Sequence, residues 1–121
     1  MILADSSIWI DHLHRNDTGL GALLDLDEVS CHDLVVQEIA LGSVKNRQVV
    51  LRDLDALSKE ASLSHEELLV LIERHGLWGR GLSSVDIHLL GAVLLSEGRA
   101  KLWTRDKALH VIATELGIAY V

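Results

Sequence analysis

The chain has 121 residues, of which 18 are Asp or Glu, 11 are Lys or Arg and 49% are apolar. A chain of this length buries roughly two thirds of its extended surface, so we expect a single domain over residues 1–121 that folds without a disulfide. The lone cysteine, Cys31, excludes a disulfide framework and a Cys-rich zinc site. The first residues lack a basic region, and no apolar run approaches the roughly 20 residues of a membrane span, so we expect a cytoplasmic protein with no membrane contact.

Four short segments have the apolar or alternating pattern of β-strands: Ile2–Ala4, Glu28–His32, Ala100–Thr104 and Ile118–Val121. Segments with helical spacing separate them. These are Leu34 to Leu41 after an Asp33 cap, Val50 to Ala61, and Leu68 to Ile72 after Ser64. Because strands separated by helices usually run parallel, the order predicts an α/β sandwich with helices on both faces of the sheet.

Helix ends are marked by capping residues. Ser64 with Glu67, and Ser83 with Asp86, have the spacing of capping boxes, in which each side chain satisfies a backbone N–H of the other residue. Gly76, Gly98 and Gly117 stand where helices are expected to end. These signals predict the boundaries of the later helices.

Four acids are spaced so that they can meet at one edge of the predicted sheet. Asp5 follows the first strand and Asp106 comes shortly after the strand that ends at Thr104. Glu38 lies within the helix after the second strand, and Asp86 opens a later helix. Ligands of open parallel sheets bind beyond the carboxyl ends of the strands. Crowded carboxylates repel one another, and a hard divalent cation such as Mg²⁺ or Mn²⁺ relieves that repulsion, so the pattern predicts a metal site.

Each of these acids also has a purely structural interpretation. A capping box accounts for Asp86, Asp106 can begin the last helix, and Asp5 can be an ordinary turn residue. Glu38 is flanked by apolar residues, so it either occupies the one polar stripe of its helix or is buried for a purpose.

Four motifs contain these acids, namely Leu3–Asp11, Glu38–Gly42, Ser84–Leu90 and Leu102–Lys107. Together they closely resemble the PIN-domain ribonucleases of the VapC toxin family, and Leu63–Glu67 and Arg74–Gly79 resemble one branch of it. The resemblance covers essentially the whole chain. It implies a PIN-like three-layer α/β/α sandwich with a mostly parallel central sheet of about four to five strands.

The same resemblance implies an activity and a set of site residues. It implies an Mg²⁺- or Mn²⁺-dependent endoribonuclease, in which metal-activated water hydrolyses RNA. The implied catalytic and metal-binding residues are Asp5, Glu38, Asp86 and Asp106, with Glu38 as an acceptor of the water's proton and with Ser6 and Thr104 as supporting polar residues. Such a protein is the toxin of a toxin–antitoxin module, paired with an antitoxin and with itself as a homodimer. Transfer, ribosomal and messenger RNA are all compatible with this site.

The net charge of −7 is unusual for a protein that binds RNA, because phosphate contacts normally come from Lys and Arg. Four basic residues surround the last acid in sequence: Arg99, Lys101, Arg105 and Lys107. Arg80, in the loop before Asp86, is a further candidate. We interpret Arg80, Arg105 and Lys107 as possible RNA-binding residues, the alternative being ordinary solvated ends of a strand and a helix.

The histidines and tryptophans give no evidence for a zinc site and little for a second binding site. The histidines, His12 and His14 included, lack the spacing of zinc ligands. Trp9 and Trp103 are expected in the core, whereas Trp78 is a better candidate for contact with a ligand. Two alternative functions remain at this point. One is a phosphoacceptor receiver-like signalling domain using Asp53 or Asp55, and the other is a catalytically silent PIN-like binding module.

Overall fold

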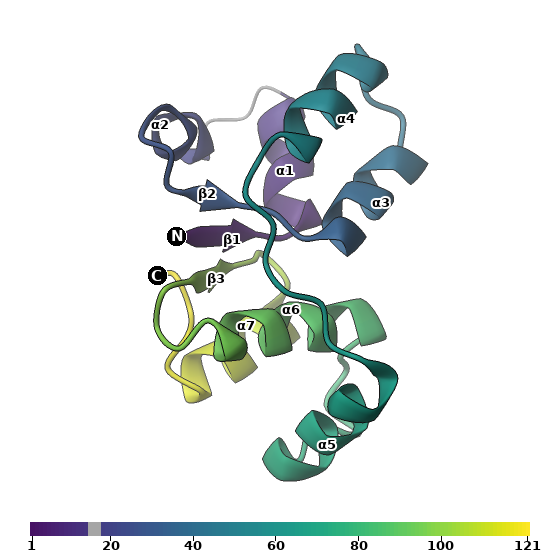
Figure 1. Cartoon of the computed structure of the whole chain (residues 1–121), viewed down its shortest axis with the longest axis vertical. Helices are drawn as coiled ribbons and strands as arrows, with labels where there is room; N and C mark the ends of the chain where they lie inside the picture. Colours follow the sequence, from purple (N-terminus) through teal and green to yellow (C-terminus); the bar gives the residue numbers. More distant parts are fainter. Residues whose placement is uncertain (15–17) are drawn as a thin grey trace.

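A computed structural model describes residues 1–14 and 18–121. Its strands are β1 (Ile2–Ala4), β2 (Val29–Ser30) and β3 (Lys101–Trp103). Its helices are α1 (Ser6–Leu13), α2 (Leu20–Asp25), α3 (Asp33–Leu41), α4 (Arg47–Asp55), α5 (His65–His75), α6 (Ser84–Leu95) and α7 (Lys107–Glu115). Figure 1 shows their arrangement. Over the described part of the chain, no helix is long and apolar enough to cross a membrane.

The sheet has the order β2-β1-β3 and is parallel throughout. Leu3 lies opposite Ser30 on one side and opposite Leu102 on the other. The chain leaves β1 toward β2 and later returns past β1 to β3, so β1 and β3 flank the point at which the connections reverse direction. Ligands of such sheets bind there, beyond the carboxyl ends of the strands. The predicted α/β class is therefore confirmed.

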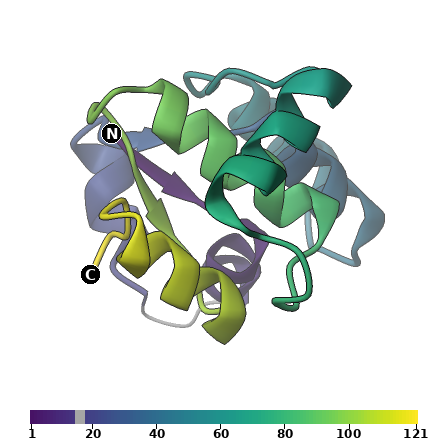
Figure 2. The ribbon, with the colours of Figure 1, turned by 90° about the horizontal axis from the view of Figure 1, so that it is seen from below.

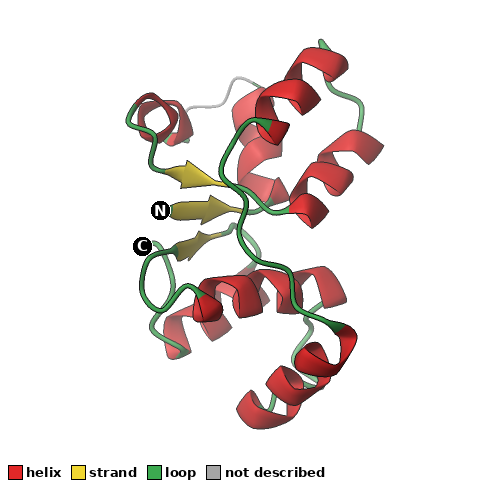
Figure 3. Cartoon of the chain, viewed as in Figure 1, coloured by secondary structure: helices red, strands yellow, loops and turns green. Residues whose placement is uncertain are grey.

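The sheet has fewer strands than the expected four to five. The segment after Gly117 contributes a single parallel bridge, Leu102 to Ala119, instead of the expected strand Ile118–Val121. The opposite edge has an unexpected bridge between Cys31 and Lys59. Lys59 lies in the long loop from α4 to α5, which crosses the strands of the sheet in Figure 3. The segments around Ala119 and Lys59 each form one bridge with the neighbouring strand, and neither continues into a ladder of hydrogen bonds.

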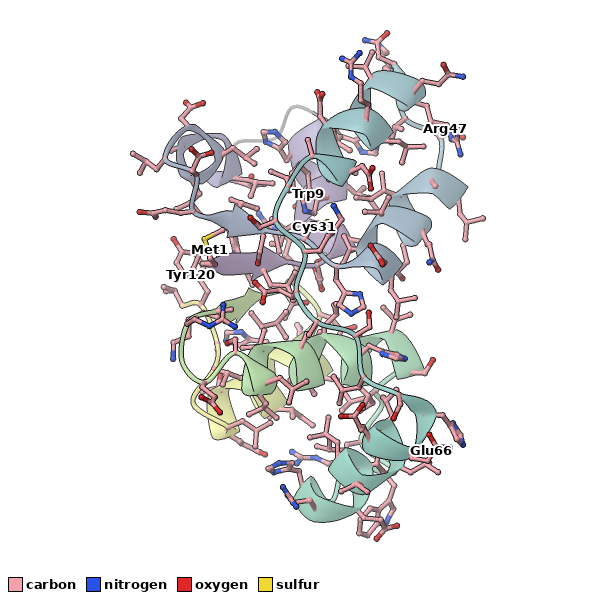
Figure 4. All side chains as sticks on the ribbon, viewed as in Figure 1. Met1, Trp9, Cys31, Arg47, Glu66 and Tyr120 are labelled. Carbon is pink, nitrogen blue, oxygen red and sulfur yellow. The ribbon has the colours of Figure 1, made fainter. Side chains whose placement is uncertain are left out.

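Helices lie on both sides of the sheet. In Figure 1, α1 to α4 lie on the side of β2, and α5 to α7 lie on the side of β3. Figure 2 shows α5 packed beside α6. The side chains of Leu3 and Leu102 are fully buried between these layers, and Trp9 and Cys31 are buried as predicted (Figure 4). Burial of this apolar set is the main favourable contribution to folding.

Helix boundaries follow the predicted caps, with three differences. Both capping boxes are present, and Gly76 ends α5 in the left-handed conformation. The cap of α3 is His32 instead of Asp33, because the His32 Nδ1 accepts a hydrogen bond from the Leu34 N–H. Helix α4 ends at Asp55, well before Ala61, and the two early helices, α1 and α2, were not predicted.

Candidate active site

One pocket of about 310 Å³ lies beyond the carboxyl ends of β1 and β3 and is lined by all four predicted acids. Asp5 follows β1, Glu38 comes from α3, Asp86 from the first turn of α6, and Asp106 precedes α7. The remaining lining residues are Ser6, Ser7, Gly81, Ser83 and Leu89. Residues more than 100 positions apart in the chain therefore share one wall.

Asp5 is the buried anchor of this pocket, with 7% of its surface exposed. One carboxylate oxygen, Oδ1, caps α1 by accepting from the backbone N–H groups of Ser7 and Ile8, and it also accepts from the Ser7 hydroxyl. The other oxygen accepts from the Thr104 hydroxyl. Burial nevertheless raises the pKa of Asp5, although these hydrogen bonds act in the opposite direction. The carboxylate is thus held rigidly in a site where negative charge is costly.

Asp86 and Asp106 each use one carboxylate oxygen to cap a helix. The Asp86 Oδ2 accepts from the Ser83 N–H at 2.9 Å, and the Asp106 Oδ1 accepts from the Leu109 N–H at 2.9 Å. The second oxygen of each has no hydrogen-bond donor among the described residues. The capping role of both residues is therefore confirmed, and it leaves the second oxygen of each carboxylate available for the predicted site.

Glu38 lies at the exposed rim of the pocket, on the polar face of α3. Burial raises the pKa of Glu38, and the neighbouring Asp5 and Asp86 carboxylates raise it further, whereas a hydrogen bond with Ser6 lowers it. Glu38 was expected either on the polar stripe of its helix or in a buried position, and it lies on the polar stripe. A carboxyl group with a raised pKa is well suited to accept a proton near neutral pH.

Three helices begin at this pocket, and their partial positive charges face the acids. Asp5 and Asp106 are the N-caps of α1 and α7, and Asp86 is the third residue of α6. A helix N-terminus stabilises a nearby negative charge, which is one reason why four carboxylates can gather here. The set of donors is made only of oxygen atoms, as Mg²⁺ and Mn²⁺ prefer.

The donor set fits a hard divalent cation in chemical type, but the carboxylates would have to turn to reach it. Within residues 1–14 and 18–121, no three His, Cys, Asp or Glu side chains lie close enough together to hold one ion as they stand. Asp86 and Asp106 each present an oxygen that the caps leave unused.

The supporting residues include two that the sequence analysis did not assign to the site. Thr104 contacts Asp5 as predicted, and Ser6 interacts with Glu38. Ser7 was missed, although its hydroxyl donates to Asp5 and accepts from the Arg105 N–H at 3.1 Å. Ser83 was recognised only as a cap, yet it lines the pocket. For Ser7, its place one residue after the predicted supporting residue Ser6 was the available signal.

The basic residues near the pocket are largely paired with acids. Arg80 forms two hydrogen bonds with Glu115, at 2.9 and 3.0 Å, and the Arg105 Nε lies 2.6 Å from Asp11. Lys107 opens α7, next to Asp106. Arg99 and Lys101 are near Asp106 in sequence, but they precede or begin β3, whereas Asp106 follows its end.

The receiver-like alternative is not supported by the position of its acids. Asp53 and Asp55 lie within α4, and their side chains are 69% and 84% exposed. A phosphoacceptor acid would be expected at the end of a buried strand. Both are instead surface residues of a helix.

Comparisons with known proteins agree with the fold. No family model matches the chain. It is 51% identical over 119 residues to Ribonuclease VapC32 of Mycobacterium tuberculosis, in both strain CDC 1551 / Oshkosh and strain H37Rv, covering 98% of this chain and 95% of the relative. Its fold is similar to that of PAE2754 from Pyrobaculum aerophilum, with a TM-score of 0.63 and 16% identity over 92% of this chain and 83% of the other. Identity at this level over nearly the whole length shows that the chain belongs to the VapC ribonuclease family.

Proposed function

We propose that this protein is a toxin endoribonuclease that hydrolyses RNA phosphodiester bonds at the Asp5 pocket with Mg²⁺ or Mn²⁺. The observation that carries the proposal is the meeting of Asp5, Glu38, Asp86 and Asp106 around one pocket at the carboxyl edge of the sheet. The kinship with a ribonuclease supports the type of reaction. Four oxygen-donor carboxylates support a hard cation as its cofactor.

The roles of the side chains follow from their contacts. When bound, a divalent cation supplies Lewis-acid stabilisation of the scissile phosphate and lowers the pKa of water. Asp5 provides the fixed ligand, because its carboxylate is held by two hydroxyl groups and two backbone N–H groups. Asp86 and Asp106 contribute their uncapped oxygens. Glu38 accepts the proton of the attacking water, for which its raised pKa suits it.

The partner of the toxin is an antitoxin protein, and the toxin pairs with itself as a homodimer in the cytoplasm. Several large apolar side chains are at least half exposed, and they would be covered in such complexes: Leu26, Leu41, Leu69, Val70, Trp78, Leu95 and Val111. Chain mass by light scattering, with and without the co-expressed antitoxin, tests both associations. A monomeric toxin at all concentrations would contradict the homodimer.

The decisive experiment is cleavage of total cellular RNA by the purified, antitoxin-free protein in Mg²⁺, in Mn²⁺ and in EDTA. We expect discrete cuts that require the metal and are lost in Asp5→Asn and Asp86→Asn. Mapping the ends of the products identifies the RNA substrate. Asn is chosen because its amide oxygen can still cap the helix, so that the substitution removes the charge and leaves the cap.

A matched control separates loss of charge from loss of fold. Asp25 is an exposed acid at the end of α2 that lines no part of the pocket, and Asp25→Asn should cut RNA as the unaltered protein does. A folded Asp5→Asn protein that still cuts would contradict the assigned site. Absence of cleavage by the folded, metal-loaded protein would favour the silent binding module instead.

A further inference from the structure

A second pocket, of about 370 Å³, is lined in part by Thr104, whose hydroxyl donates to Asp5. It is lined by Trp103, Thr104, Arg105, Lys107, His110 and Val121. Three of its lining residues are basic, namely Arg105, Lys107 and His110, whereas the active-site pocket is lined by four carboxylates. We name it the basic pocket. We infer that the basic pocket binds the backbone phosphate of the RNA nucleotide adjacent to the scissile bond, through Lys107 and His110; this inference rests on the proposed function.

The two pockets share a wall and are joined by hydrogen bonds. Thr104 lines the basic pocket while its hydroxyl donates to Asp5 in the other. The Arg105 N–H donates to Ser7, which lines the active-site pocket. Asp106 and Lys107 are consecutive residues, about 3.8 Å apart at their Cα atoms, and each lines a different pocket. The two pockets are therefore adjacent, as a subsite for the next phosphate of the strand requires.

The positive charge of this subsite comes from Lys107, and the His110 ring adds a hydrogen-bond donor beside it. An acidic pocket repels RNA, so affinity must come from cations beside it. Arg80 and Arg105 are already paired with Glu115 and Asp11. Lys107 and His110 have no ion pair among the described residues, and they lie three positions apart on α7, which places them on the same face of the helix.

Trp103 gives the basic pocket an aromatic wall. The indole is partly exposed and meets the Tyr120 ring edge-on, with ring centroids 5.2 Å apart. Trp103 packs against the core as expected, but it is only partly buried and also lines the pocket. An indole beside a phosphate site offers a surface for the ribose or base of the same nucleotide.

The test is the salt dependence of RNA binding, which reports phosphate contacts and not the stability of the fold. Binding of a short single-stranded RNA of mixed sequence is measured in EDTA over a series of KCl concentrations, on the full chain with Asp5→Asn so that the RNA stays intact. We expect Lys107→Gln to reduce the slope of log K against log salt by about 0.7 and to weaken binding about fivefold near 0.1 M salt. His110→Ala should also weaken binding, and Lys107→Arg should retain it.

Arg99→Gln is the matched control, because Arg99 is an exposed cation at the opposite end of β3. It should leave the slope unchanged. An unchanged slope in Lys107→Gln, or equal effects in Arg99→Gln, would overturn the inference, as would failure of the Asp5→Asn protein to bind RNA at the lowest salt. Cleavage by the unaltered protein is scored separately. Metal-dependent cutting with an unchanged Lys107→Gln slope would contradict the subsite alone, whereas absence of cutting would contradict the proposed function.

Discussion

Substitution of Thr104 by Val tests how the protein keeps the buried Asp5 carboxylate ionised. Thr104 is 7% exposed, and its hydroxyl donates to Asp5 while accepting from the Asp106 N–H at 3.0 Å. Val has nearly the same shape, so the substitution removes the hydroxyl with little change in packing. Asp106 is exposed, and its N–H can bond to water instead. The main effect of the substitution is therefore that Asp5 loses one hydrogen-bond donor.

The expected size of the effect follows from this one hydrogen bond. A hydrogen bond to a charged group contributes about 1.5–3 kcal/mol, and this one lowers the pKa of Asp5 against the effect of burial. Without it, the pKa of Asp5 rises further and the ionised form becomes less favourable. Because a metal binds the carboxylate and must displace the proton, its affinity should fall roughly ten- to hundredfold in the acidic range.

The assay is calorimetric titration of Mn²⁺ into the unaltered protein, Thr104→Val and Thr104→Ser over a series of pH values. The deficit of the Val variant should be largest at low pH and should narrow as the pH rises, because Asp5 then loses its proton in both proteins. Thr104→Ser retains the hydroxyl and should bind as the unaltered protein does. Equal Mn²⁺ affinity of Thr104→Val and the unaltered protein at every pH would refute the reasoning.

Three further predictions concern stability. Burial raises the pKa of Asp5, so the metal-free fold loses stability as the pH rises through that pKa. Mg²⁺ binds the ionised carboxylate, so the increase in Tm that Mg²⁺ causes should grow with pH. The same increase in Tm at every pH would contradict this. Burial, and next the neighbouring His88, lower the pKa of His32 below its ordinary value of 6.5. The buried neutral imidazole therefore stabilises the fold at pH values above 6.5, and this stabilisation is lost as the pH falls through the lowered pKa. His32→Asn, which can still cap α3, should flatten this acid-side loss in urea unfolding. Leu102→Ala should cost about 2–5 kcal/mol in urea unfolding, whereas the 89% exposed Leu41→Ala should change stability by less than about 0.5 kcal/mol.

Local features of this protein could be predicted from its sequence because they depend on residues a few positions apart. The Ser83–Asp86 capping box is an example: both hydrogen bonds form within one helical turn. The α/β class followed from the alternation of apolar strands and helical spacing, and the four acids were found from their places after strands and within helices. The N-cap His32 was missed because the neighbouring Asp33 is the commoner capping residue.

Only the tertiary structure decided which distant groups meet. The Arg105–Asp11 and Arg80–Glu115 pairs join residues far apart in the chain, and no local pattern indicates them. The same holds for the single-residue bridges at the sheet edges and for the basic pocket lined in part by Thr104. Hydrogen-bond spacing within a helix is set by local backbone geometry, whereas these contacts depend on how the crossovers stack whole elements around β1. The sequence alone therefore determined the residues of the acidic site, and the packing of the elements decided which cations remain available beside it.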